Sequence, residues 1–131
     1  KFFKQSYPKS LDRAYFSLNG LDKLNLEDGA ATLSLLTAKS IIYGISQCPI
    51  PPKYLYLSGG GRKNKTIVNI LEKELPSKIM TIDELGFDGD MLEANAFAYL
   101  AIRSLKKYPL TFPKTTGVKA PISGGKIFYA N

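Results

Sequence analysis

The sequence of 131 residues contains no histidine and a single cysteine, Cys48. Without an imidazole, Ser-His-Asp and Cys-His catalysis, histidine-ligated metals and histidine pH switches are excluded. One thiol cannot form a disulfide within the chain or assemble a cysteine zinc site. We therefore expect no metal site, and we expect a cytoplasmic protein because a lone cysteine suits a reducing compartment.

Long apolar runs are also missing. No stretch approaches the roughly 18 apolar residues that a membrane span needs. The longest uncharged run of the first half, residues 40–52, ends in a cluster of prolines and suits a buried helix better. The first residues, Lys1 to Lys4, lack the apolar core of a signal peptide, and no initiator methionine precedes them. We expect no membrane partner, and an N-terminus cut from a longer polypeptide.

The composition is that of an ordinary globular protein. Hydrophobic residues make up 44% and charged residues 22% of the sequence, which argues against a disordered chain and predicts a packed core. The length predicts a single domain, or a piece of one, over residues 1–131.

Charge is unevenly distributed. The chain has 18 basic and 11 acidic residues, a net charge of +7. Residues 83–93 contain five acids and no base, whereas residues 94–131 contain six bases and no acid. The basic tail, with aromatic residues between its bases, is typical either of a solvated lysine-rich surface or of a nucleic-acid-binding module. No recognisable nucleic-acid-binding signature accompanies it.

Helical spacing of apolar residues predicts a long helix from Leu26 to about Ile45. Asn25 is placed to cap it, and the prolines of residues 49–52 end it. The apolar face is wider than one stripe, so we expect this helix to be covered on two sides.

A strand, a glycine turn and a helix follow. Residues 54–58 predict a short buried strand, and the apolar stripe from Ile67 to Leu75 predicts a helix capped by Asn64. Residues 77–82 predict a second strand. Alternating strands and helices predict an α/β unit with a parallel sheet and a right-handed crossover.

A third helix is predicted from the segment Asp90 to Glu93, which has the form of a capping box. Its apolar stripe continues to Leu105. From Tyr108 onward, prolines and glycines predict an irregular tail with at most a short strand at residues 127–129.

The turn Gly59 to Gly61 lies where backbone N–H groups can approach a phosphate or a nucleotide closely. It lacks the Gly-Lys-Ser/Thr of a phosphate loop, and Asn64 stands where the dinucleotide fingerprint has its third glycine. Two interpretations stay open, a ligand loop and a mere tight turn. The bases Arg62, Lys63 and Lys65 beside it favour an anionic ligand.

Several segments along the chain are informative through their order and spacing, taken together, rather than singly. The three longest are Leu57 to Asn64, Thr81 to Gly86 and Glu93 to Ala101, and shorter ones are Pro8 to Ser10, Glu27 to Ala38, Thr116 to Gly117 and Gly125 to Ile127. Together they resemble the C-terminal part of anhydro-N-acetylmuramic acid kinases over nearly the whole chain. One departure is Leu11-Asp12, where the family has a Thr-Gly pair.

The resemblance implies a partial ribonuclease H-like (actin-like ATPase) lobe, with helices packed on a short parallel sheet. Such kinases have two lobes and use ATP with magnesium to phosphorylate 1,6-anhydro-N-acetylmuramic acid, opening its anhydro ring with water during peptidoglycan recycling. By resemblance, Gly59, Gly60 and Gly61 would bind the adenosine side of the nucleotide, and Glu93 would face the sugar.

The resemblance also implies what the chain lacks. The family's phosphate loop and its catalytic aspartate lie upstream of the matched segments, and no aspartate here corresponds to the latter. We therefore expect no catalytic residue in residues 1–131, and a C-terminal lobe that is inactive without an N-terminal lobe supplied in cis or by another chain. The alternatives are a basic nucleic-acid-binding module and a non-catalytic remnant.

Overall fold

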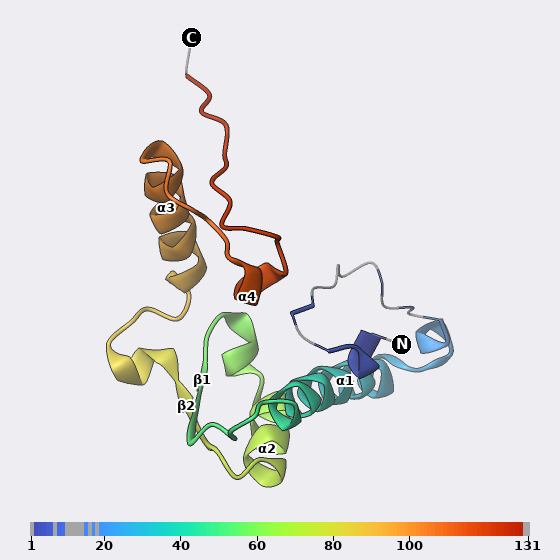
Figure 1. The fold of residues 1–131 in the computed structure, drawn as a ribbon. Coiled ribbons are helices and arrows are strands. Elements are labelled where there is room, and N and C mark those ends of the chain that lie inside the picture. The colour runs from blue at the N-terminus through green and yellow to red at the C-terminus, as the bar shows by residue number, and fades with distance from the viewer. Residues whose placement is uncertain (1, 7, 10–14, 16, 18, 130–131) are drawn as a thin grey trace. The chain divides into compact units, whose positions relative to one another are not determined.

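The computed structural model describes residues 2–6, 8–9, 15, 17 and 19–129 (Figure 1). The chain divides into two compact units, one of Phe16–Leu92 and one of Lys1–Tyr15 with Glu93–Asn131. Ser10, Leu11 and Asp12, which enter the family resemblance, lie outside the described residues.

The unit of Phe16–Leu92 begins with α1, which spans Leu26–Ser46. The Asn25 side chain accepts a hydrogen bond from the Asp28 N–H at 2.8 Å and so caps the helix as predicted. The acidic residues Glu27 and Asp28 in the first turn interact favourably with the positive, N-terminal end of the helix dipole. The helix ends just before the proline cluster, as expected.

A parallel sheet of two strands follows α1. Strand β1, Tyr54–Leu57, pairs with β2, Lys78–Thr81, with Tyr54 opposite Lys78 and Leu57 opposite Thr81. Helix α2, Lys65–Glu74, connects the two strands, because parallel neighbours need a crossover. The predicted order of strand, glycine turn, helix and strand is confirmed.

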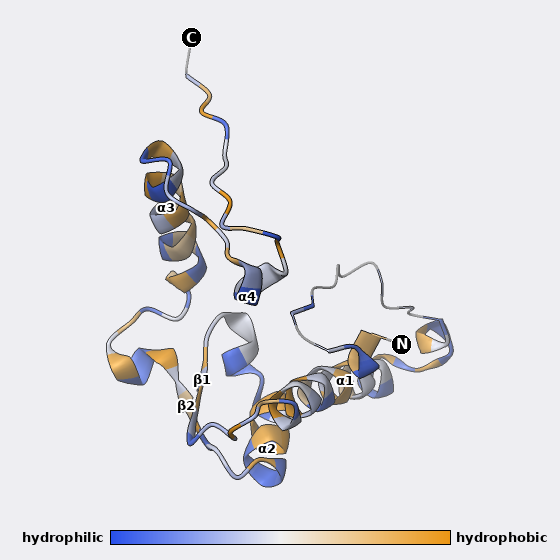
Figure 2. Cartoon of the chain, in the orientation of Figure 1, coloured by the Kyte–Doolittle hydropathy of each residue, from blue (hydrophilic) through white to orange (hydrophobic). Residues whose placement is uncertain are grey.

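The packed centre of this unit lies between α1 and α2. Ala38 of α1 and Leu71 of α2 are fully buried, and Lys39 pairs with Glu74 at 2.6 Å beside them. Figure 2 shows hydrophobic residues on both helices near their junction.

Two predictions about burial are wrong. The described residues do not cover helix α1 on two sides, because α2 packs on one face while Leu26 is 88% exposed and other leucines of the helix are exposed as well. Strand β1 is not buried either, because its side chains alternate between half-buried and exposed. Tyr54 and Tyr56 lie on the exposed face with their rings 6.3 Å apart.

The other unit contains most of α3, Leu92–Leu105, and the short α4, Pro113–Thr116. Between Thr111 and Ile122 there is an isolated antiparallel bridge. Arg103 lies in the last turn of α3, and its Nε donates a hydrogen bond to the Pro109 carbonyl at 2.7 Å. The tail is irregular as predicted, and residues 127–129 form no strand. Among the described residues, no helix is long and apolar enough to cross a membrane.

Candidate functional site

The glycine turn lies at the carboxyl edge of the sheet. Strand β1 ends at Leu57 and leads through Gly59 into the 3-10 turn Gly60–Lys63, and β2 ends at Thr81 and leads into the 3-10 turn Ile82–Leu85. Because the strands are parallel, both connections leave the same edge. This edge is where α/β proteins commonly bind ligands.

Only one of the three glycines has a backbone that demands glycine. Gly59 has φ of 70° and ψ of −178°, a conformation that side chains disfavour strongly. Its N–H donates to the Gly89 carbonyl at 2.9 Å, and its carbonyl accepts from the Arg62 N–H at 3.2 Å. A tight turn therefore explains Gly59.

The conformation of a tight turn does not explain why residues 60 and 61 are glycine. Neither has a positive φ, and a Cβ atom added at either position would meet nothing within 4 Å. Both residues are exposed. Within the described part of the chain, their N–H groups are matched to no acceptor. The fold would accept side chains here, so the absence of side chains favours a molecule approaching the backbone closely.

Asn64 caps α2, as the sequence predicts. Its side-chain oxygen accepts hydrogen bonds from the N–H groups of Thr66 at 3.0 Å and Ile67 at 3.3 Å. The side-chain oxygen of Asn64 is therefore engaged by the N-terminus of α2.

Arg62 joins the glycine turn to the segment that follows β2. Its Nε donates to Asp83 at 2.9 Å, and its Nη1 donates both to Asp90 at 2.7 Å and to the Gly59 carbonyl at 3.0 Å. Lys63 reaches the other oxygen of Asp90, also at 2.7 Å. The Arg62 side chain is only 7% exposed, whereas both carboxylates are about half exposed. We call Arg62, Lys63, Asp83 and Asp90 the arginine cluster.

The cluster favours the charged forms of Arg62, Asp83 and Asp90. Hydrogen bonds from Arg62 and Lys63 lower the pKa of Asp90 far below its ordinary value, and Arg62 together with the Gly89 N–H lowers the pKa of Asp83. The same two carboxylates raise the pKa of Arg62.

Two cations thus face two anions within the cluster. The charges of Arg62 and Lys63 are therefore balanced inside the chain, which argues against their part in the predicted preference for an anionic ligand. The part of Lys65 stays a prediction.

Gly89 is the residue against which this cluster is packed. It is buried, and its N–H donates to Asp83 at 3.2 Å. A Cβ atom at this position would lie 2.6 Å from Nε of Arg62 and 2.8 Å from the Asp83 carboxylate. The sequence motifs did not point to Gly89 or to the two aspartates as parts of this cluster. The acid-rich segment after β2, facing a basic pair after the glycines, is the signal that could have revealed it.

The predicted capping box at the start of α3 is wrong. Both oxygens of Asp90 accept from Arg62 and Lys63 instead of from the helix. Asp88 accepts hydrogen bonds from the N–H groups of Asp90 and Met91, at 2.8 and 3.2 Å, just before the helix. The pairing with Arg62 and Lys63 joins the Asp90 carboxylate to two cations, whereas a cap would join it to neutral N–H groups.

Glu93 lies exposed in the first turn of α3. It belongs to the other compact unit from the glycine turn. Its assignment to a sugar stays a prediction.

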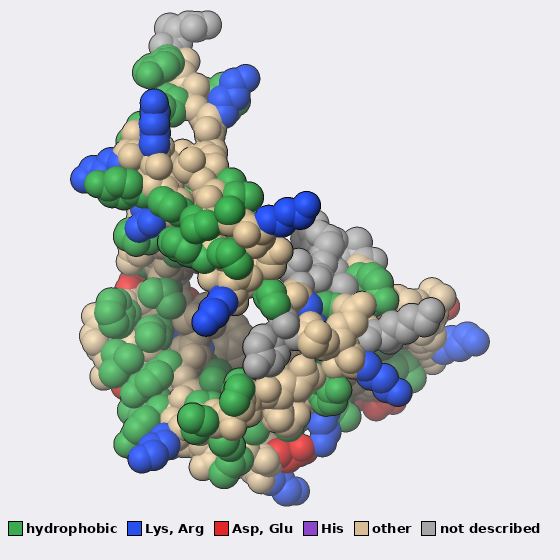
Figure 3. Space-filling view, viewed as in Figure 1, with side chains coloured by type: hydrophobic (Ala, Val, Ile, Leu, Met, Phe, Trp, Pro, Cys, Tyr) green, Lys and Arg blue, Asp and Glu red, His purple; other side chains and the backbone are tan. Residues whose placement is uncertain are grey.

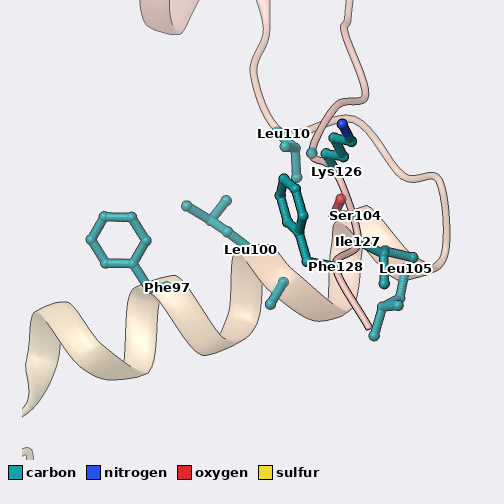
Figure 4. A pocket seen from close by; sticks show the side chains of 10 residues that line it. Phe97, Leu100, Ser104, Leu105, Leu110, Lys126, Ile127 and Phe128 are labelled. Carbon is teal, nitrogen blue, oxygen red and sulfur yellow. The ribbon is translucent and has the colours of Figure 1, made fainter. Parts of the chain in front are cut away.

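That unit also contains an apolar hollow of about 550 Å³, between α3 and residues 125–128 (Figure 4). Phe97, Leu100, Leu105 and Phe128 line it, and Lys126 is its only charged residue. It lacks the converging polar groups of a catalytic site. Among the residues described, no three His, Cys, Asp or Glu side chains gather so as to hold a metal ion.

A glycine turn between a strand and a helix, at the carboxyl edge of a parallel sheet, defines an α/β protein with a candidate nucleotide-binding edge. The family model of anhydro-N-acetylmuramic acid kinase matches residues 1–130, so the chain belongs to that family. This confirms the resemblance.

Relatives named anhydro-N-acetylmuramic acid kinase are similar along almost the entire chain. The protein of Zymomonas mobilis is 45% identical over 129 residues, which are 98% of this chain and 35% of that protein. Those of Roseobacter denitrificans and Phenylobacterium zucineum are 42% and 44% identical, covering 98% and 96% of this chain and 34% of each relative. The chain thus spans about a third of the length of these relatives.

Proposed function

We propose that residues 1–131 form the C-terminal lobe of a two-lobed kinase with the ribonuclease H-like (actin-like ATPase) fold. The kinase uses ATP to phosphorylate 1,6-anhydro-N-acetylmuramic acid and opens the anhydro ring with water. Family membership and the names of the relatives support this activity. The parallel sheet with helices is consistent with part of such a lobe.

The observation that carries the proposal is the exposed backbone of Gly60 and Gly61. Among the described residues, these two adjacent N–H groups have no acceptor and no side chain fills the space beside them, which suits the close approach of a nucleotide. Because the charges of the arginine cluster balance, this turn suits the uncharged adenosine side of ATP better than its phosphates.

The described residues do not fit a magnesium site. The two aspartates nearest the glycine turn, Asp83 and Asp90, are both paired with cations. The metal, the phosphate loop and the base that activates water would belong to an N-terminal lobe, in the same polypeptide or in another chain. Phosphoryl transfer depends on such groups converging around the phosphate. This lobe supplies binding, through the glycine turn and through Glu93 as an acceptor for a sugar hydroxyl.

A nucleic-acid-binding module is the alternative. On the face drawn in Figure 3, Lys and Arg side chains are scattered singly and gather into no continuous patch. No observation favours the alternative over the kinase lobe.

The proposal is tested by Gly61→Val in the two-lobed kinase. A branched side chain would block the approach of the nucleotide, while the open space and the ordinary φ of Gly61 let the protein keep its stability. We expect a loss of ATP affinity of about tenfold or more, equivalent to about 1.4 kcal/mol, with an unchanged melting temperature. Gly44→Ala in α1, where a Cβ also meets nothing, is the control. Unchanged ATP affinity in folded Gly61→Val would remove the nucleotide assignment.

The reciprocal variant is Glu93→Gln. The carboxamide keeps the shape of the side chain but changes its charge and acceptor pattern. We expect weaker binding of the sugar with ATP affinity preserved, both measured by titration calorimetry. A variant that binds the sugar as tightly as the unmodified kinase would remove Glu93 from the sugar site.

A further inference from the structure

We propose that Arg62 is a positioning residue that holds the Gly59 to Gly61 turn in its ligand-receiving shape. The inference rests on the proposed function, because it assigns a purpose to the shape of that turn. Arg62 contacts the loop itself and two carboxylates that come after β2, more than 20 residues further along the chain.

The glycine turn has few other ties to the fold. Gly60 and Gly61 carry no side chain that could pack, and both are exposed. Leu57, the last residue of β1, is only half-buried. The contacts that fix Gly59 are its backbone hydrogen bond to Gly89 and the two hydrogen bonds that its carbonyl accepts from Arg62. Polar ties, rather than apolar packing, therefore determine the conformation of the turn.

Arginine is suited to this position by its geometry. The planar guanidinium has five N–H donors in a fixed arrangement, and here it serves a carbonyl and two carboxylates at the same time. A lysine would carry the same charge but could not match these directions together. Burial of the Arg62 side chain to 7% exposure keeps water from competing for these bonds.

Gly89 provides independent support. Its N–H binds Asp83, its carbonyl binds the Gly59 N–H, and its missing side chain leaves the space that the guanidinium occupies. The segment after β2 is thus shaped to receive Arg62. A methyl group at position 89 would displace the guanidinium without changing any charge, and it offers a second way to break the same contact.

The experiment uses the two-lobed kinase, labelled for NMR. Amide hydrogen exchange of Gly59 reports the order of the turn, since this N–H is held by the bond to Gly89. Shifts of the Gly60 and Gly61 resonances on addition of ATP report ligand binding. The variants are Arg62→Met, Arg62→Lys and Gly89→Ala, with Lys65→Met as the control that removes one charge in the first turn of α2.

We expect Arg62→Met and Gly89→Ala to raise the exchange rate of the Gly59 amide by about tenfold or more, and to weaken ATP binding. Arg62→Lys should have smaller effects than Arg62→Met on both the exchange rate and ATP binding. Lys65→Met should change the exchange rate of the Gly59 amide little. The melting temperature should stay close to that of the unmodified protein, since Ala38 and Leu71, the buried centre between α1 and α2, make none of the bonds of the cluster.

Two results would overturn the proposal. One is exchange in Arg62→Met no faster than in Lys65→Met. The other is faster exchange with unchanged ATP affinity, which would leave Arg62 with a purely structural role. Failure of the proposed function has a different signature, because the unmodified two-lobed kinase would then show no ATP-induced shifts at Gly60 and Gly61. In that case the proposal for Arg62 would fall together with the nucleotide assignment.

Discussion

Glycine at positions 59, 60, 61 and 89 meets three different physical needs. Gly59 adopts a positive φ that side chains disfavour, and Gly89 leaves the space that a guanidinium fills. Gly60 and Gly61 meet neither need, which supports their proposed role as contacts for a ligand. The same residue type therefore marks a turn, a packing site and a candidate ligand contact within about thirty residues.

The pKa shifts of the arginine cluster predict how the turn responds to pH. Because the pKa values of Asp83 and Asp90 are lowered in the folded chain, their stabilising contribution is complete above the ordinary aspartate pKa of about 3.9 and is lost as pH falls through the lowered values. We expect the protection of the Gly59 amide, corrected for intrinsic exchange, to be constant between about pH 5 and 8 and to fall only in stronger acid. Loss of protection near neutral pH would contradict this, and Arg62→Met should lack the acid transition.

At the scale of elements, local signals account for the helices and strands. The caps Asn25 and Asn64, the prolines after α1 and the short strand between proline and glycine all act within a few residues of sequence. Local predictions failed where a residue distant in sequence competes for the same side chain. The capping box at Asp90 was wrong because Arg62 lies within reach of that carboxylate.

The N-cap of α2 leads to a prediction for stability. Asn64→Ala removes the acceptor of the Thr66 and Ile67 N–H groups, and we expect the free energy of unfolding to fall by about 1 kcal/mol in urea denaturation. Asn69→Ala, within the same helix, is the control, and its better helix propensity should leave stability equal or slightly higher. Equal effects of the two substitutions would show that Asn64 is not an energetically significant cap.

At the scale of the whole molecule, the described residues leave much apolar surface uncovered. Phe97 and Phe128 are 64% and 79% exposed beside the apolar hollow of α3, and several leucines of α1 are exposed as well. Large uncovered apolar patches are typical of surfaces that pack against further protein. This agrees with the proposal that the chain is one lobe of a protein about three times its length.

The same proposal predicts that this chain alone does not phosphorylate 1,6-anhydro-N-acetylmuramic acid. Phosphoryl transfer needs a phosphate loop, a metal and a base in addition to the glycine turn. In a coupled assay of ADP release we expect no turnover above that of a blank without protein. Turnover near the roughly 1 to 100 per second of kinases would contradict the assignment of a single lobe.

The sequence by itself determined the three long helices, the two strands and their order, because caps, prolines and apolar periodicity act locally. It also indicated the family to which the chain belongs, and it identified Gly59 to Gly61 as a candidate site. Tertiary structure alone decided which of those glycines the backbone requires, and that Arg62 binds Asp83 and Asp90 instead of leaving its charge for a ligand. The reason is that the parallel register of β1 and β2 brings both carboxyl ends to one edge, a contact between residues that lie far apart in the sequence.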